Sequence, residues 1–218
     1  MMMRAAVVVI VALLPAVEAL AEGHAVGVRV GALGIGPEYT YELNDRIAFR
    51  GGIYGAELGF DDEQSGIDYE FDVVWDSLAV GVDFHPLKTA LRLSAGFLKN
   101  DNGLRAIARP TSNENVGGTT YTPQEIGTLT GSVGFDDTAP FLGVGWDWSR
   151  DKRIFGMSFD VGVLDQGDPV VTLTGNGTLL GNPQFEQDIN DEEAELQGSL
   201  DGDVDLVPYV SLGFVFRF

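Results

Sequence analysis

Residues 211–218 read SLGFVFRF, and the alternation of side chains in this stretch decides the fold. The larger apolar side chains share one parity: Val210, Leu212, Phe214, Phe216 and Phe218. The other parity holds smaller or charged side chains: Ser211, Gly213, Val215 and Arg217. Successive side chains of a β-strand point to opposite faces, so the pattern predicts a strand with one apolar face and one small or charged face.

The same contrast recurs along the chain. It is found in VGVRVGA (26–32), EYTYEL (38–43), IAFRGGI (47–53), LAVGVDF (78–84), LRLSAGF (91–97), LGVGWDW (142–148) and FGMSFDVGV (155–163). Opposite the apolar side chains stand mostly Gly, Ala and Ser, with isolated charges of both signs. A strand of a soluble sandwich would instead carry abundant Lys, Glu and Thr on its water-facing side. The pattern therefore favours a narrow barrel whose apolar outer face meets lipid.

Composition and charge exclude several classes of function. The chain has 218 residues, 44% of them hydrophobic, which fits one folded domain or a single large barrel. It carries 33 acidic and 13 basic residues, a net charge of −20, so binding to nucleic acid is not expected. The absence of cysteine excludes disulfides and thiolate metal sites. No cofactor is expected.

The first residues predict export. Arg4 gives a positive start, the segment 5–14 is apolar, and Ala19-Leu20-Ala21 matches a cleavage site. We therefore expect a signal peptide over residues 1–21, cleaved after Ala21, and an outer-membrane barrel over 22–218. The alternative is a buried strand or a short membrane anchor. No later stretch has the ~18–20 apolar residues of a membrane helix, so a membrane protein would have to be a closed barrel.

Short connections between the expected strands alternate with long ones. The short ones are 44–46, 85–89 and 149–154, and the long acidic ones are 59–70, 100–134 and 165–205. Short periplasmic turns and long extracellular loops are typical of outer-membrane barrels. An even strand count makes Leu33–Pro37 the first outer turn, although the first two segments could instead form one long bent strand.

The turn at 149–154 predicts how deep the residues around it lie in the membrane. Trp146, Trp148 and Phe155 flank it and should lie near the periplasmic interface, where aromatic side chains are favoured. Arg150 and the basic residues 152 and 153 should then face periplasmic water.

Two of the long connections predict local structure. Thr122-Pro123-Gln124-Glu125 is a capping box with proline at the first helical position, which predicts a short helical turn. Asn182-Pro183 opens a second helix to about Leu200, with Phe185, Ile189, Leu196 and Leu200 on one face. That helix either lies on the barrel mouth or binds a partner. Before it, VVTLTGNGT (170–178) predicts a strand that extends beyond the membrane.

These residues resemble the small outer-membrane β-barrel proteins of Gram-negative bacteria, of the OmpA/OmpX-like or OmpW-like type. The resemblance rests on the leader, the alternating strands, the connections and the terminal FVFRF (214–218). It implies an all-β, up-and-down antiparallel transmembrane barrel of about eight strands, with short helices in long extracellular loops. It further implies outer-membrane lipid and the barrel-assembly machinery as partners, with Phe214, Phe216 and Phe218 as the assembly signal. The family shares no catalytic motif, and its members include anchors, adhesins, channels and lipid-modifying enzymes.

The inward parity carries charges that predict pairing across the lumen. A hairpin at 85–89 sets Asp83 opposite Arg92, and a hairpin at 44–46 sets Arg50 opposite Thr40. The expected network consists of Arg29, Arg50, Arg92 and Arg217 with Glu38, Glu42, Asp83 and Asp160. An unpaired buried charge costs several kcal/mol, so near-balance in a narrow interior predicts a plugged lumen.

Catalytic and metal chemistry find little support. Asp83, His85 and Ser94 could form a triad on the lumen side, but a polar lining with a histidine at its rim is the simpler interpretation. DGDVD (201–205) lacks the glycine and the acid that an EF-hand requires, so no metal site is assigned. The acidic loops are either a solvated charge run or a loose site for divalent cations.

Three functions remain open at this point. The first is a non-enzymatic surface barrel with a packed lumen, in a structural or interaction role. The second is a narrow, porin-like channel for small solutes. The third is a soluble, lipocalin-like exported barrel.

Overall fold

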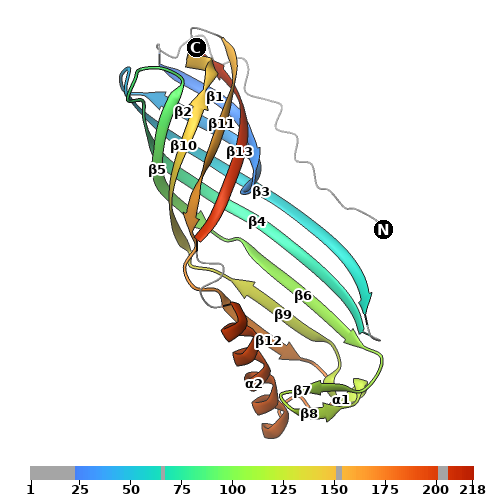
Figure 1. The fold of residues 1–218 in the computed structure, drawn as a ribbon. Helices are drawn as coiled ribbons and strands as arrows, with labels where there is room; N and C mark the ends of the chain where they lie inside the picture. The colour runs from blue at the N-terminus through green and yellow to red at the C-terminus, as the bar shows by residue number, and fades with distance from the viewer. Residues whose placement is uncertain (1–22, 65–66, 151–153, 201–205) are drawn as a thin grey trace.

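The strands of the chain close into a ring, and part of the same sheet projects beyond the ring (Figure 1). The computed structural model describes residues 23–64, 67–150, 154–200 and 206–218. The expected signal peptide, the basic residues 152 and 153, and the stretch 201–205 lie outside the described residues.

Eight strands form the barrel. In order around the ring they are β1 (His24–Gly31), β2 (Gly34–Glu42), β3 (Ile47–Gln64), β4 (Ile67–Phe84), β5 (Leu91–Asn100), β10 (Thr138–Asp147), β11 (Phe155–Asp165) and β13 (Leu206–Arg217). Each pairs antiparallel with the next, and β13 pairs with β1 to close the ring. The fold class expected from the sequence is confirmed.

The alternation of side chains fixes which face of each strand is apolar. Val28, Phe97, Leu142 and Phe214 point outward and are 48%, 57%, 63% and 59% exposed. Side chains of the opposite parity, such as Asp160, are buried in the barrel. The outside is therefore an apolar belt and the inside is polar or small, as lipid on one side and a narrow lumen on the other would require. Among the described residues, every helix is too short or too polar to cross a membrane.

The short connections and both described chain ends lie at one end of the barrel. The amide of Phe218 donates to the carbonyl oxygen of His24 at 3.0 Å. Trp146 and Trp148, at the end of β10 and in the 3-10 turn η2 (Trp148–Arg150), are exposed at this end.

The first outer turn is shorter than expected. Ala32 and Leu33 form it, and Gly34 already pairs with Gly31. Residues 34–37 thus belong to β2 rather than to the turn, and the alternative of one bent strand is wrong. Gly34 has a φ of +97°, which glycine adopts at little cost, so the chain can reverse direction at once.

A projecting sheet continues from the long-connection end of the barrel. β3 and β4 run beyond the ring, and β6 (Gly103–Pro110), β9 (Leu129–Gly134) and β12 (Val170–Gly175) add to them in the order β3-β4-β6-β9-β12. The segment 59–70, expected as a loop, is strand up to Gln64 and again from Ile67. In β4 the apolar Ile67, Tyr69 and Phe71 alternate with acidic side chains, as a strand requires, but here the apolar set lies on the face continuous with the barrel interior. The strand expected at 170–178 is present as β12, and it ends at Gly175.

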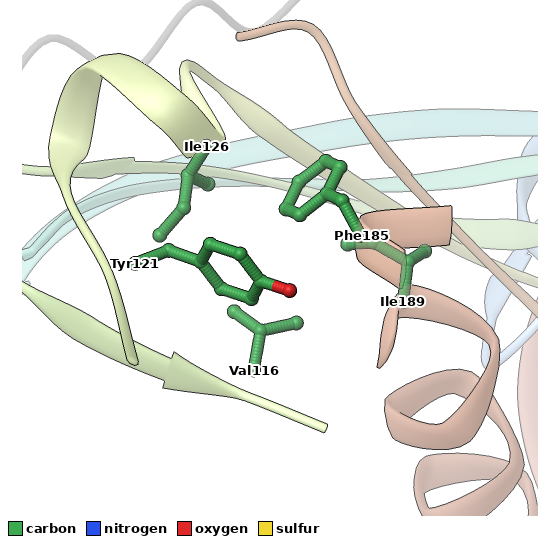
Figure 2. Close-up of a cluster of buried hydrophobic side chains, with 5 residues drawn as sticks. All are labelled: Val116, Tyr121, Ile126, Phe185 and Ile189. Atoms are coloured by element: carbon green, nitrogen blue, oxygen red, sulfur yellow. The ribbon is translucent and has the colours of Figure 1, made fainter. Parts of the chain in front are cut away.

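A small core of its own holds the far end of this sheet together (Figure 2). It is built from the β7–β8 hairpin (Glu114–Val116 and Thr119–Tyr121), α1 (Pro123–Ile126) and α2 (Pro183–Leu200). Val116, Tyr121, Ile126, Phe185 and Ile189 are its buried side chains.

Both predicted helices are confirmed, and one lies where it was not expected. The capping box forms between Thr122 and Glu125 at the start of α1. α2 packs along β12 (Figure 1), not on the barrel mouth, because Phe185 and Ile189 insert into the small core. Leu196, on the same helical face in the sequence, stays 41% exposed.

Candidate functional site

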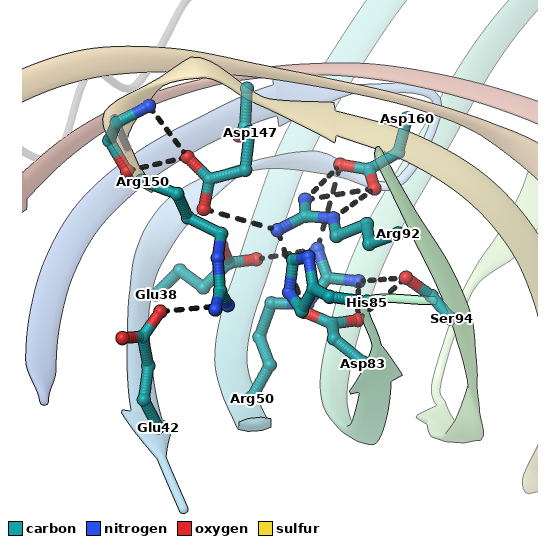
Figure 3. Close-up of polar contacts among 12 residues, drawn as sticks. Glu38, Glu42, Arg50, Asp83, His85, Arg92, Ser94, Asp147, Arg150 and Asp160 are labelled. Carbon is teal, nitrogen blue, oxygen red and sulfur yellow. Dashed lines mark hydrogen bonds and ion pairs between the residues drawn. The ribbon is translucent and has the colours of Figure 1, made fainter. Parts of the chain in front are cut away.

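The lumen of the barrel brings together the charged residues expected there. Figure 3 shows Arg50 of β3 and Arg92 of β5 converging with carboxylates inside the ring. The centre is Asp160 on β11. Arg92 donates to it from Nη2 at 2.7 Å to Oδ2 and from Nε at 3.0 Å to Oδ1. Arg29 donates to the same carboxylate, and Arg50 Nη1 lies 3.5 Å from Oδ2. Asp160 is 1% exposed, so its charge is compensated by arginines and not by water.

Glu38 forms the second carboxylate of this layer. Arg29 donates two hydrogen bonds to it, from Nε to Oε2 at 2.6 Å and from Nη2 to Oε1 at 2.9 Å. The Tyr54 hydroxyl donates to Glu38 Oε2 at 2.7 Å. Arg50 Nη1 lies 3.5 Å from the same oxygen. A planar fork that serves two carboxylates at once is a geometry that lysine cannot supply.

Asp83 is the third carboxylate, and its neighbour across the hairpin differs from the expected one. Thr40 pairs with Arg50 as predicted, but Asp83 pairs with Ser94, not with Arg92. The Ser94 hydroxyl donates to Asp83 Oδ1 at 2.6 Å, and Arg50 donates to it at 3.1 Å. Arg92 Nη1 still reaches Oδ2 at 3.5 Å. The shift is two residues, which changes the partner but leaves every side chain on its predicted face.

The turn after β4 gives the physical reason for the shift. His85 is buried, and its Nδ1 lies 3.2 Å and 3.1 Å from the carbonyl oxygens of Thr89 and Leu91. Lys88 adopts a φ of +54°. The ring thus occupies the inside of a wide turn, and the tight hairpin assumed from the sequence cannot form.

A second charged layer lies nearer the short-turn end. Arg217 donates from Nη2 to Asp147 Oδ2 at 2.9 Å and also bonds Glu42. Arg150 Nη1 lies 2.9 Å from Glu42 Oε1. Arg150 was expected in periplasmic water, and that expectation is wrong. Glu42, an expected member of the network, is paired with Arg217 and Arg150.

Asp147 and Arg150 are the residues of the network that the sequence did not single out. Asp147 lies on the inward parity of LGVGWDW, so the alternation alone was a sufficient signal for it. Arg150 follows the strand in η2, where strand parity no longer applies.

An apolar layer fills the lumen at the other end of the barrel. Leu98, Ala139, Leu164 and Tyr209 are buried together, and the ring centroids of Phe141 and Tyr209 lie 6.2 Å apart, edge to face. Inward glycines make room for these rings. A Cβ on Gly143 would lie 2.3 Å from the Tyr209 hydroxyl, and one on Gly96 would lie 2.7 Å from the end of the Phe141 ring.

The hydrogen bonds of Asp83, His85 and Ser94 are not those of a catalytic triad. Ser94 donates to Asp83, while the imidazole contacts backbone carbonyls. In a triad the histidine would bridge the serine and the acid, as the base that removes the hydroxyl proton. In the part of the chain that the structure describes, no group of three or more His, Cys, Asp or Glu residues is arranged to hold a metal ion.

The terminal aromatic residues lie on the outer face of β13, the strand that closes the ring. Phe214 is exposed, and Phe216 and Phe218 are half-buried. Phe216 lies 4.9 Å from Phe155 and 5.7 Å from Phe218, ring centroid to ring centroid. They thus form an aromatic group beside the seam between β13 and β11.

An antiparallel barrel with an apolar belt, a polar interior, short turns at one end and long segments at the other is the architecture of the small outer-membrane β-barrel proteins of Gram-negative bacteria. Comparison with known proteins supports this class. CarO2 of Acinetobacter baumannii has a similar structure, with a TM-score of 0.60 at 19% identity over 90% of this chain and 99% of that chain. CarO of the same organism has a TM-score of 0.59 at 20% identity, over 89% of this chain and 97% of that chain.

A weaker likeness is to Ail, the attachment invasion locus protein of Yersinia pestis, with a TM-score of 0.40 at 15% identity over 91% of this chain and 100% of that chain. No protein-family model and no curated protein sequence matches the chain. The likeness to the two CarO structures concerns the fold, and the fold is that of an outer-membrane barrel protein.

Proposed function

We propose that the chain is an integral barrel of the outer membrane whose lumen is permanently filled, and that it serves a structural or interaction role without catalysis. The observation that carries this proposal is the compensated network around Asp160. Three arginines from β1, β3 and β5 meet one buried carboxylate, so the network spans the lumen from side to side.

Opening the lumen would require breaking this network. Removing one partner of a buried ion pair costs about 3–5 kcal/mol, because the remaining charge is left in a medium of low polarity. A solute would also have to displace Tyr209 and Phe141 from the glycine-lined space they fill. Both layers therefore favour a static plug over the alternative, a narrow porin-like channel.

The apolar belt supports a membrane location over a soluble, lipocalin-like barrel. Side chains such as Ile53 and Phe97, 60% and 57% exposed, would face water around the whole circumference of a soluble protein. Outer-membrane lipid covers them in the proposed setting. The assembly role of Phe214, Phe216 and Phe218 and the cleavage after Ala21 belong to the same proposal. So does the loose uptake of divalent cations by acidic loops, with a solvated charge run as the alternative.

A liposome-swelling assay tests the filled lumen. Vesicles carrying the folded barrel are diluted into isotonic solutions of small sugars and amino acids. We expect swelling no faster than in vesicles without protein. Swelling that depends on the amount of barrel and on solute size would establish the channel alternative.

A further inference from the structure

The projecting sheet has two edge strands, β12 and β3, and only the backbone edge of β12 is covered. At the β12 border, α2 supplies side chains that take the place of a neighbouring strand. Gln197 Oε1 accepts from the amide of Val171 at 2.9 Å, and Glu193 Oε2 accepts from that of Leu173 at 2.7 Å. The Gln197 side-chain amide donates to the carbonyl oxygen of Pro169 at 2.6 Å. This border is closed to a further strand.

The β3 border is open. β2 pairs with β3 only as far as Gly55, and in the described part of the chain no other strand pairs with β3 on that side. Figure 1 shows this part of β3 running along the free margin of the sheet.

The backbone groups that face this margin can be identified. The carbonyl oxygen of Arg46 accepts from His85 at the end of β4, while that of Ile47 accepts from Leu43 on the β2 side. The pairing of β3 with β4 is then continuous to Gln64, so the alternation is kept. The amides and carbonyls of Glu57, Gly59 and Asp61 therefore point away from β4, toward the open margin.

The two faces beside this margin differ in chemistry. On the face continuous with the barrel interior lie Leu58 and Phe60, 48% and 54% exposed, with Phe71 stacked 5.2 Å from Phe60. On the other face Asp61 lies opposite Glu70, and Glu63 lies opposite Asp68. Like charges directly opposite each other are destabilising. Arg109 pairs with Glu70, but Glu57, Asp61 and Glu63 form no ion pair within the described residues.

We propose that the open margin of β3 binds an extended polypeptide segment whose side chains alternate between cationic and apolar. Such a segment would add as a strand and bond Glu57, Gly59 and Asp61 through its backbone. One set of its side chains would continue the apolar row of Leu58 and Phe60. The other set would lie beside the uncompensated acids.

A second copy of this chain is a poorer occupant. Antiparallel pairing of two β3 margins about Gly59 would place Glu57 of one copy opposite Asp61 of the other, and these like charges repel. This binding site would give the proposed interaction role a partner. It rests on the proposed function in one respect, that the projecting sheet lies outside the membrane.

The probe is a capped octapeptide of alternating lysine and valine, added to the full barrel in detergent micelles. Its control is a peptide of the same composition with four lysines followed by four valines. Binding isotherms and backbone amide exchange are the readouts. We expect saturable binding of the alternating peptide with slower exchange at Gly59 and Asp61. The block peptide should bind about tenfold more weakly.

Two variants at one position separate backbone pairing from charge attraction. Gly59→Pro removes an outward amide, and an edge strand tolerates proline there. Gly59→Ala keeps the amide, and its Cβ would meet the movable Asp72 carboxylate at 3.0 Å and the Phe71 carbonyl oxygen at 3.8 Å, an ordinary contact distance. We expect about tenfold weaker binding in the proline variant alone.

Equal binding of the two peptides would overturn the proposal, and so would equal binding by the two variants. Protection of the same amides without peptide, growing with protein concentration, would replace it with self-association. None of these outcomes bears on whether the lumen is filled, which liposome swelling decides separately.

Discussion

Arg92 and Asp160 meet in the lumen across an intervening strand, because the residue between them is a glycine. Gly145 of β10 pairs with Arg92 on one side and with Asp160 on the other. A Cβ on Gly145 would lie 2.2 Å from Asp160 Oδ1 and 2.8 Å from Arg92 Nε. The same relation holds for Gly213, which separates Arg29 from Ser158. Inward glycines thus let long side chains from alternate strands meet.

Replacing Gly145 by alanine should therefore weaken the barrel. The added methyl must displace the guanidinium or the carboxylate, and overpacking of this kind costs about 1–3 kcal/mol. Gly51→Ala is the matched control, since its Cβ would meet only the carbonyl oxygen of Ala79 at 3.7 Å. Urea unfolding, followed by the difference in gel mobility between folded and heated protein, measures both. Equal midpoints for the two variants would contradict the glycine's role.

Arg92→Ala should be more damaging. It leaves Asp160 and Asp83 short of a counter-charge in the buried layer, with an expected loss of about 3–5 kcal/mol. Arg109→Ala removes an exposed pair with Glu70, in which both side chains are about half exposed, and should cost less than about 1 kcal/mol. The free energy of unfolding of the purified barrels is the measurement. A loss no larger for Arg92→Ala than for Arg109→Ala would show that the network does not stabilise the lumen.

Removal of Phe218 tests the assembly signal. We expect several-fold less folded barrel in the outer membrane, with export unaffected, because the barrel-assembly machinery would no longer recognise the terminal strand. Phe155→Ala is the control, since it removes an exposed ring of the same aromatic group, 4.9 Å from Phe216, and leaves the chain end intact. Fractionation followed by quantitative immunoblotting distinguishes them. Equal outer-membrane levels of the truncated and full-length chains would refute the signal.

The small core of the projecting sheet should respond to pH. Tyr121 donates to Asp188 at 2.5 Å, which holds the pKa of that carboxyl below its ordinary value. A lowered pKa contributes stability above the ordinary pKa of an aspartate, and this contribution is lost as pH falls through the folded value. The same hydrogen bond raises the pKa of Tyr121. The stability that the tyrosine contributes is therefore lost only at high pH, above the ordinary tyrosine pKa near 10.

We therefore expect proteolysis of the β7–β8 hairpin to accelerate in acid below about pH 4. Tyr121→Phe removes the donor and should flatten that dependence while keeping the ring in the core. Limited proteolysis of the folded barrel across pH, with an acid-stable protease, reports the rate. An unchanged acid response in Tyr121→Phe would exclude this hydrogen bond as its cause.

The sequence predicts faces better than partners in this protein. Alternation places Arg29, Arg50, Asp83 and Asp160 inside because a strand has a strict period of two. It cannot decide between Arg92 and Ser94 as the neighbour of Asp83, because a two-residue shift in register preserves the face. That choice depends on the turn, where the buried His85 and the left-handed Lys88 widen the hairpin. The pairing of Arg150 was not predicted because this residue lies outside any strand. The open margin of β3 was not predicted because the acidic residues at 59–70 resembled a loop.

The central claim is that two layers of side chains close the lumen. Ion conductance through the purified barrel in planar lipid bilayers tests it most directly, with insertion of folded protein verified by gel mobility of the same preparation. The account predicts no resolvable unitary step at either polarity, because the arginine network and the Tyr209–Phe141 layer leave no continuous path for hydrated ions. Stable conductance steps of uniform size from the unmodified protein would contradict it.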